Sequence, residues 1–427
     1  MPNWGSSMIR RLVAVVLLAV TAYASADDYE YPYQNPYLAT VMGTPDSVKA
    51  SVPDTIPLKK RYLPQIEGRK IPDALWYGAR LDYVYAKQKG PAPLVFVIAG
   101  TGASCDSEKN QFLMRALYAA GFHVVGITSP TYPTFVIAQS TTMVPGEQRM
   151  DAADIYNVMQ KAWNEIGPGM KVTSFYLTGY SLGATNAAFV SLLDEDKKVF
   201  KFQKVLLLNP SVQLYNSISK LDRFLENIPG GVDNFNKMFH RIVNQLGTAY
   251  KRSTNVSFSP DLIFDAFKEN PPSDEELAAL IGISFRLSAS ALVFTSDVMT
   301  NYGFIKPANE VLTRNTKMDD FAQVSLRVGF TDYFHEYAWP FYEKTTPMKT
   351  RAEFATYQGL QSIQDYLISA RKVGVVDNHD DVILAPGEID FLINTFDTRA
   401  KIFPYGGHLG NMEERDYTAY VVDYFKR

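Results

Sequence analysis

The sequence predicts an α/β fold in which a mostly parallel central sheet is flanked by helices. Its first half alternates short, almost wholly apolar segments with helical ones, and such runs are typical of parallel strands buried on both faces. Residues 94–98 (Leu-Val-Phe-Val-Ile) and 205–208 (Val-Leu-Leu-Leu) are two of these runs. The alternation stops after residue 210 and resumes near residue 371, so we expect a mainly helical insertion before the last strands.

The composition is that of an ordinary globular protein. The chain has 427 residues, 46% of them hydrophobic and 20% charged, which is enough for one large domain with an insertion or for two domains. A net charge of −3 gives no reason to expect nucleic acid as a partner. Cys105 is the single cysteine, so no disulfide can form within the chain and the core has to hold the fold together.

The N-terminus is predicted to be a secretory signal peptide, residues 1–26. Arg10 and Arg11 precede a short apolar run at 12–24, which ends in Ala-Ser-Ala at 24–26. A basic segment, a short apolar segment and a small-residue cleavage site are the parts of such a peptide. The run is short for a membrane span, so a retained anchor is the less favoured alternative. We expect a periplasmic or secreted protein.

The elements of the remaining chain are expected in a regular order. Residues 27–70 are rich in Tyr, Pro and Asn and predict irregular chain with one strand near 58–63. The alternating part predicts strands at 75–86, 93–99, 122–127, 172–178 and 204–208, and helices at 107–120, 146–166 and 184–190. Strands at 371–376 and 400–403 and helices at 386–396 and 411–425 complete the pattern.

The insertion is predicted to form a helical cap, or lid, over the edge of the sheet. Ser273 and, three residues later, Glu276 form a capping box at the start of a long helix. This helix is apolar almost all round, so we expect it to be buried against protein or to line an apolar cavity. Gly282 and Arg286 interrupt it, which argues against a transmembrane span. The predicted division is a signal peptide (1–26), a first core segment (27–212), the insertion (213–367) and a second core segment (368–427).

A candidate nucleophile lies at Ser181, within Gly-Tyr-Ser-Leu-Gly at 179–183. A buried strand, a sharp Gly-x-Ser-x-Gly turn and a helix of small residues together form a nucleophile elbow. Gly179 and Gly183 lack Cβ atoms, which lets the strand and the helix cross closely. The alternative interpretation is a turn without function. Cys105 is a weaker candidate nucleophile, and a small loop residue is its simpler interpretation.

The candidate base is His408, one of only five histidines. It follows a short strand on a glycine-rich loop just before the final helix, from which it can reach over the sheet edge. His123 lies within a predicted strand, at a packing position. His240 and His335 lie in the insertion, where we expect them to be ordinary core or surface histidines. His379 lies close to the candidate acids, where it is awkwardly placed for Ser181.

The candidate acid lies in the loop at 377–381, after the preceding strand. A serine hydroxyl needs a base to take its proton and an acid to orient that base. Asp377, Asp380 and Asp381 are all available. Asp381, which directly precedes an apolar pair, fits best, and Asp380 is the alternative. The other aspartates are expected to bond their own backbone, as turn residues do.

Two backbone amides are expected to stabilise an oxyanion. One belongs to Leu182, the residue after the nucleophile, and the other to the glycine-containing loop at 99–104, where Thr101 is the candidate. Metal and cofactor motifs are absent from the sequence, which has no His-Glu-x-x-His, no phosphate loop and no dinucleotide fingerprint. We therefore expect no cofactor and no metal, and a solvated or capping role for Asp151 and Asp154.

These segments resemble, in their order and roles, the α/β-hydrolase superfamily. The resemblance covers residues 90–212 and 370–427, and the insertion falls where this family has its lid. It implies Ser181 as nucleophile, Asp381 as acid and His408 as base, with the amides of Leu182 and Thr101 forming the oxyanion hole. Ala99 departs from the family pattern, because many members have His before the first glycine of the oxyanion loop.

The predicted function is that of an exported serine hydrolase acting on carboxylic esters or thioesters. The apolar insertion favours a small-molecule or lipid-like ester with a hydrophobic acyl group, and transient contact of the insertion with a membrane surface is a further expectation. A peptidase on the same fold is one alternative. A non-catalytic binding protein on a hydrolase scaffold is the alternative from another class, although such proteins generally lose part of the site.

Overall fold

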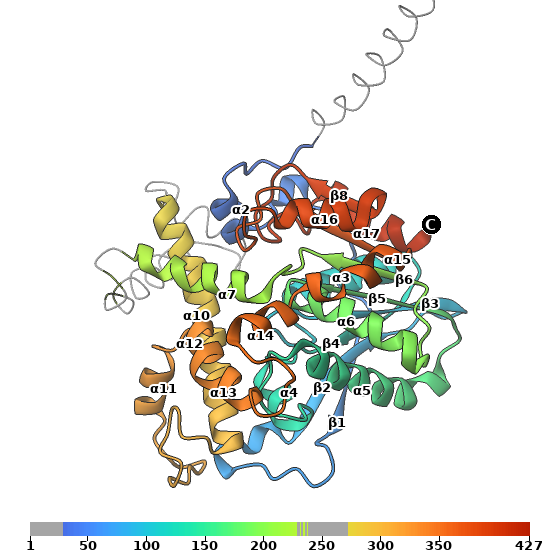
Figure 1. Cartoon of the computed structure of the whole chain (residues 1–427). Coiled ribbons are helices and arrows are strands. Elements are labelled where there is room, and N and C mark those ends of the chain that lie inside the picture. The colour runs from blue at the N-terminus through green and yellow to red at the C-terminus, as the bar shows by residue number, and fades with distance from the viewer. Residues whose placement is uncertain (1–28, 229–230, 232–233, 235–236, 238–271) are drawn as a thin grey trace, which may run out of the picture.

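A computed structural model of the chain describes residues 29–228, 231, 234, 237 and 272–427 (Figure 1). The predicted signal peptide and His240 lie outside these residues. The division into core segments and insertion stays a prediction.

Eight strands form one sheet in the order β1-β2-β4-β3-β5-β6-β7-β8. The pairs β1–β2 and β2–β4 are antiparallel, and every other neighbouring pair is parallel. The strands are β1 (Lys59–Pro64), β2 (Arg80–Ala86), β3 (Ala92–Ile98), β4 (His123–Ile127), β5 (Val172–Tyr180), β6 (Lys204–Leu208), β7 (Val373–Asn378) and β8 (Ala400–Phe403).

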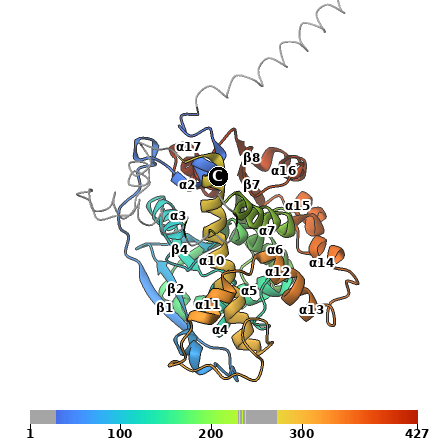
Figure 2. The ribbon, with the colours of Figure 1, turned by 90° about the vertical axis from the view of Figure 1, so that its left-hand side faces the viewer.

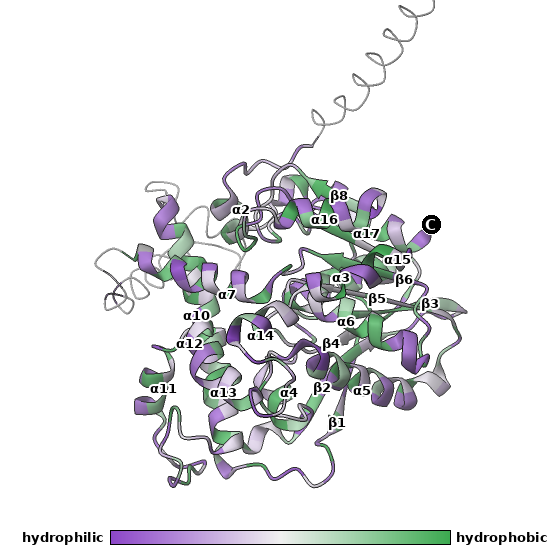
Figure 3. Ribbon diagram, in the orientation of Figure 1, coloured by the Kyte–Doolittle hydropathy of each residue, from purple (hydrophilic) through white to green (hydrophobic). Residues whose placement is uncertain are grey.

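Helices cover both faces of the sheet. The helices of the described residues, including those between β6 and β7, are α2 (Pro36–Met42), α3 (Glu108–Ala119), α4 (Pro133–Ala138), α5 (Gln148–Ile166), α6 (Leu182–Lys197), α7 (Leu214–Arg223), α10 (Asp274–Thr300), α11 (Asp319–Ser325), α12 (Phe330–Asp332), α13 (Trp339–Tyr342), α14 (Arg351–Tyr357), α15 (Gln364–Ser369), α16 (Glu388–Phe396) and α17 (Arg415–Lys426). Helices α5 and α7 show alternating hydrophobic and hydrophilic residues, as expected for helices with one buried side (Figure 3).

The side chains of the central strands alternate between two hydrophobic cores. Leu94, Phe96 and Ile98 of β3 pack on the face covered by α5, α6 and α16. Val95 and Val97 pack on the opposite face, with α3 and α17. Because successive side chains of a strand point to opposite faces, burial on both faces accounts for the uninterrupted apolar sequence of this strand.

The described residues between β6 and β7 form helices and no strand, as the sequence predicts. Ser273 and Glu276 make the predicted capping box, and α10 then runs unbroken for 27 residues, so Gly282 and Arg286 do not interrupt it. In Figure 2 this helix crosses the molecule from top to bottom. It contacts α2, α4, α7 and α11. By length and composition α10 could cross a membrane, but 56% of its most apolar stretch is buried inside the protein.

Three element predictions are wrong in detail. The strand expected to begin at residue 75 begins at Arg80, because residues Asp73–Gly78 form a 3-10 helix. The N-terminal segment expected to be irregular contains α2, whose start Asn35 caps by accepting a hydrogen bond from the Leu38 amide. The final helix starts at Arg415 rather than near residue 411, and Glu414 caps it.

The register brings several strand ends to one edge of the sheet. Tyr180 at the end of β5 pairs with Leu208 at the end of β6, and Leu208 pairs with Val376 of β7. Ligands of such sheets bind at the carboxyl ends of the strands. An eight-stranded, mostly parallel sheet with a Gly-x-Ser-x-Gly elbow after β5 is the α/β-hydrolase fold, which confirms the predicted fold class.

Candidate active site

Ser181 occupies the sharp turn between β5 and α6. Its backbone has φ 55° and ψ −129°, a conformation that a residue with a side chain rarely adopts. A Cβ atom on Gly179 would overlap the carbonyl of Gly183, and one on Gly183 would overlap the carbonyls of Ile98 and Ala99. Both glycines are therefore required by close backbone approach, and the turn lifts the Ser181 side chain above the sheet edge.

Ser181, His408 and Asp381 form a continuous hydrogen-bonded chain. His408 Nε2 lies 2.9 Å from Ser181 Oγ. His408 Nδ1 lies 2.9 Å from Asp381 Oδ2 and 3.1 Å from Oδ1. All three residues are less than 8% exposed, so these contacts are shielded from bulk water. The structure thus brings together the three residues predicted as nucleophile, base and acid.

Two further donors hold the Asp381 carboxylate. Its Oδ1 accepts a hydrogen bond from the Ile383 amide at 3.0 Å, and its Oδ2 accepts one from Asn209 Nδ2 at 2.9 Å. Burial by itself raises the pKa of the Asp381 carboxyl, but the charge of His408 and these hydrogen bonds outweigh it, so the pKa lies below its ordinary value. Asp381 is therefore the ionised carboxylate beside the histidine.

Asp380, the alternative acid, has a different role. Its carboxylate accepts hydrogen bonds from the amides of Gly406 and Gly407, at 3.2 and 2.9 Å. These amides belong to the loop that carries His408, so Asp380 fixes the position of the loop, whereas Asp381 contacts the imidazole.

A second buried carboxyl, Asp377, lies behind Asp381. The side-chain amide of Asn209 donates to both residues, at 2.9 Å each, and Tyr417 in turn donates to Asn209 Oδ1 at 2.8 Å. Burial and then the neighbouring charge of Asp381 raise the pKa of Asp377 well above its ordinary value. Because two adjacent buried carboxyls do not readily ionise together, Asp377 keeps its proton and Asp381 carries the charge.

The other candidate nucleophile and bases lie elsewhere. Cys105 is buried, and burial raises the pKa of its thiol to about 12, so it holds little reactive thiolate. His123 is fully buried and accepts a hydrogen bond from the Gln88 amide, as expected for a packed histidine. His335 contacts the Tyr215 hydroxyl, and His379 is exposed.

The two predicted oxyanion donors border the same pocket as Ser181. Neither the amide of Thr101 nor that of Leu182 has a hydrogen-bond partner within the described part of the chain. The amide of Gly102, in contrast, donates to Thr131 Oγ1 at 2.8 Å and is not free for a substrate. Gly183 packs against the carbonyls of Ile98 and Ala99, which keeps the oxyanion loop close to the elbow.

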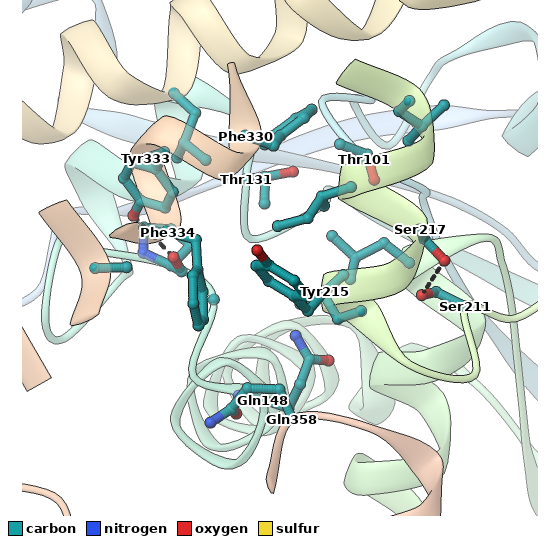
Figure 4. A pocket seen from close by; sticks show the side chains of 18 of the residues that line it. Thr101, Thr131, Gln148, Ser211, Tyr215, Ser217, Phe330, Tyr333, Phe334 and Gln358 are labelled. Carbon is teal, nitrogen blue, oxygen red and sulfur yellow. Dashed lines mark hydrogen bonds between the residues drawn. The ribbon is translucent and has the colours of Figure 1, made fainter. Parts of the chain in front are cut away.

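A largely apolar pocket opens beside Ser181. It contains about 840 Å³ of space free of atoms, a volume that includes its opening to solvent. Its apolar lining comes mainly from the insertion, and Phe330 and Phe334 form one side of it (Figure 4). Further apolar lining residues are Leu214, Ile218, Leu221, Phe285, Leu292, Ala338, Ala355 and Ile383.

Asp151 and Asp154, expected to be solvated or capping residues, are buried. Asp151 Oδ2 accepts from the Gly146 amide at 2.8 Å, and Asp154 Oδ2 accepts from the Thr141 amide at 2.7 Å. They hold the loop before α5, so the solvated role is wrong. Among the described residues no group of three or more His, Cys, Asp or Glu side chains could hold a metal ion.

Asp151→Asn is expected to stabilise the protein increasingly as the pH rises. Burial, together with the charges of Asp154 and Glu147, raises the pKa of Asp151 well above its ordinary value. At pH values between the Asp151 pKa of about 4 in the unfolded state and its raised pKa in the folded state, only the folded wild type holds the proton. The free energy of unfolding of the wild type therefore falls by about 1.4 kcal/mol for each pH unit in this interval. Asn keeps an acceptor for Gly146 and has no such dependence.

Thermal unfolding of both proteins between pH 4 and pH 9 measures this effect. The melting temperature of Asp151→Asn should exceed that of the wild type by a margin that grows with pH and vanishes near pH 4. Asp390→Asn, on the exposed side of α16, controls for the loss of one carboxylate. A margin independent of pH would contradict the burial argument.

Two supporting residues were not predicted from the sequence. Asn209 bridges Asp377 and Asp381, and its position directly after β6 at the carboxyl edge is a signal that could have identified it. Thr40 Oγ1 of α2 accepts a hydrogen bond from the His408 amide at 2.8 Å. The two residues are 368 positions apart, and no local sequence pattern predicts their contact.

No family model matches the chain, and no curated protein matches it. Solved structures do. An esterase from Pyrococcus furiosus is 9% identical, over 89% of this chain and 96% of its own, with a TM-score of 0.44. A 2-hydroxy-6-oxo-6-phenylhexa-2,4-dienoate hydrolase from a Rhodococcus strain is 13% identical over 87% and 100%, with a TM-score of 0.41. Naproxen esterase from Bacillus subtilis is 13% identical over 87% and 92%, with a TM-score of 0.39. These similarities are too distant to assign a function.

Proposed function

We propose that this protein is an exported serine hydrolase that cleaves carboxylic esters or thioesters of hydrophobic acyl groups. The hydrogen-bonded chain from Ser181 through His408 to Asp381, at the base of an apolar pocket, carries this proposal. Export rests on the signal-peptide pattern of residues 1–26, and transient contact of the insertion with a membrane surface stays a prediction.

The proposed reaction proceeds through an acyl-enzyme. His408 Nε2 takes the hydroxyl proton of Ser181 as Oγ attacks the carbonyl carbon, and then passes that proton to the departing alcohol or thiol. His408 next takes a proton from a water molecule as the water oxygen attacks the acyl carbon. It returns this proton to Ser181 Oγ as the bond between Oγ and the acyl carbon breaks and the carboxylic acid leaves. Asp381 fixes the orientation of the imidazole and stabilises its charged form in both steps.

The negative charge that develops on the carbonyl oxygen needs donors already in place. The amides of Leu182 and Thr101 lack partners in the described part of the chain and border the pocket, so they are the proposed donors. A backbone amide donor survives every substitution except that by proline, so Thr101→Pro is the change that eliminates one of them.

The apolar lining supports hydrocarbon in the acyl group. Each buried CH₂ contributes about 0.8 kcal/mol, which corresponds to roughly a fourfold gain in kcat/KM if the full contribution is realised in the transition state. We therefore expect kcat/KM for p-nitrophenyl esters to rise with acyl length from acetate onward, until the pocket is filled. A rate that falls steadily from acetate would contradict an acyl-binding role for this pocket.

Labelling with a fluorophosphonate tests the serine chemistry directly. The probe should modify Ser181, and peptide mapping should locate the adduct there. A folded wild-type protein that neither reacts with the probe nor hydrolyses any ester would instead be a binding protein. Turnover of peptide substrates with little turnover of esters would favour the peptidase alternative.

A further inference from the structure

The pocket beside Ser181 contains a polar side chain that the fold leaves without a partner. Gln148 is fully buried, and neither Nε2 nor Oε1 of its side-chain amide has a hydrogen-bond partner among the described residues. The residue lines the pocket at the start of α5, with Gln358 next to it (Figure 4). Buried amides are nearly always hydrogen-bonded, so this one requires an explanation.

Five other polar side chains of the pocket are already hydrogen-bonded within the protein. Gln358 accepts from the backbone amide of Gln148 at 2.8 Å and donates to the Phe354 carbonyl at 3.0 Å, so both ends of its amide are in use. The remaining pairs are Ser211 with Ser217, Tyr215 with His335, and Tyr333 with the Pro145 carbonyl. The Gln148 side chain is therefore available to a bound molecule.

The surroundings of Gln148 select a neutral ligand group. The described residues that line the pocket include no Lys, Arg or His that could pair with a carboxylate. Asp151 lies three residues further along α5, and burial raises the pKa of its carboxyl. The charged form of Asp151, which could pair with an ammonium group of a ligand, is therefore disfavoured. A carboxamide has a donor and an acceptor, and so can satisfy Nε2 and Oε1 together.

We propose that Gln148 determines specificity by binding an amide group in the acyl half of the substrate, away from the scissile carbonyl. This inference rests on the proposed ester hydrolysis at Ser181. The acyl half stays bonded to Ser181 until water releases it, so it is the half that a pocket around Ser181 has to hold. The substrate class is then an ester or thioester of an apolar acyl chain that carries one internal or terminal amide.

Matched pairs of p-nitrophenyl esters test this proposal. In each pair one acyl chain is all hydrocarbon and the other, of equal length, carries an amide in place of two chain atoms, with the position of the amide varied along the series. The wild type should favour the amide ester by about tenfold or more in kcat/KM at one position, because the hydrocarbon leaves Gln148 unpaired.

Gln148→Leu, which has a similar volume and no hydrogen-bonding group, should reduce this ratio to about one or below. Gln148→Met is the second variant if the leucine disturbs the fold, and thermal melting checks both. Gln364→Leu is the matched control, because its amide bonds Thr395 outside the pocket, and it should keep the wild-type ratio.

Equal rates within every wild-type pair, or a preference that survives in the Gln148 variants, would overturn the inference. Labelling of Ser181 and turnover of the hydrocarbon esters in the same experiments would show that only this inference has failed. If the wild type shows neither labelling nor turnover, the proposed function and the inference fall together.

Discussion

Replacing Ser181 by alanine is expected to lower kcat/KM for ester hydrolysis by about a million-fold. His408 then has no hydroxyl to deprotonate, and the oxyanion donors and the pocket alone sustain a small residual rate. His408→Ala should cost about as much, and the double variant little more, because the two residues act as one unit. Steady-state kinetics on a chromogenic ester, with the unfolding temperature measured in parallel, provides the test.

Ser191→Ala is the matched control for this substitution. Ser191 lies on α6, the helix that begins directly after Ser181, and is fully buried, but its hydroxyl bonds Tyr366 rather than His408. Its removal should leave kcat/KM within a few-fold of the wild type. If Ser181→Ala kept more than about one per cent of the activity, the nucleophile would have to be another residue.

Asp381→Asn is expected to lower kcat by about ten-thousand-fold. The carboxylate accepts from His408 Nδ1, from the Asn209 side chain and from the Ile383 amide, whereas an asparagine offers a single acceptor oxygen. One of these donors then faces an NH₂ group, and the histidine either turns or adopts the wrong tautomer. The loss should appear in kcat with an unchanged fold, as judged by thermal melting.

Asp380→Asn should be much milder, with a loss of about tenfold or less. Its carboxylate bonds the amides of Gly406 and Gly407 and does not touch the imidazole, so the substitution loosens the loop and leaves the acid in place. A severe loss in Asp380→Asn combined with a mild one in Asp381→Asn would reassign the acid. Both substitutions leave the length of the side chain unchanged, so neither variant creates a cavity that would contribute to the difference in activity.

The order of the site along the chain could be predicted because each part follows a buried strand. Ser181 and the aspartates of residues 377–381 each come at or just after the end of an apolar run, and parallel strands bring their carboxyl ends to one edge. The structure was needed to decide between Asp380 and Asp381. The two residues are adjacent and of the same type, and only the backbone conformation determines which side chain points toward His408. The close crossing of β5 and α6 at Ser181 was predictable from Gly179 and Gly183.

Other features depend on contacts between distant segments, which no local pattern encodes. Asp151 and Asp154 repeat at the spacing of a polar helix face, yet the loop before α5 covers them and turns a seemingly exposed pair into a buried one. Gln148 is likewise polar at the start of a helix, where exposure is the ordinary expectation. Tyr333, whose hydroxyl donates to the carbonyl of Pro145 in the loop before α5, lines the same pocket as Gln148.

Helix α2 holds the loop that carries His408, and this contact determines when the folding chain can become active. Thr40 accepts the amide of His408, at position 408 of 427, and Gly407 packs against the carbonyl of Pro36. The base thus follows the nucleophile by 227 residues along the chain, and a helix that precedes both of them holds its loop. A chain that has reached residue 400 contains the proposed nucleophile and acid but no base. On the proposed mechanism the serine stays unreactive until α2 and the loop of His408 have come together, so activity reports that this contact between distant segments has formed.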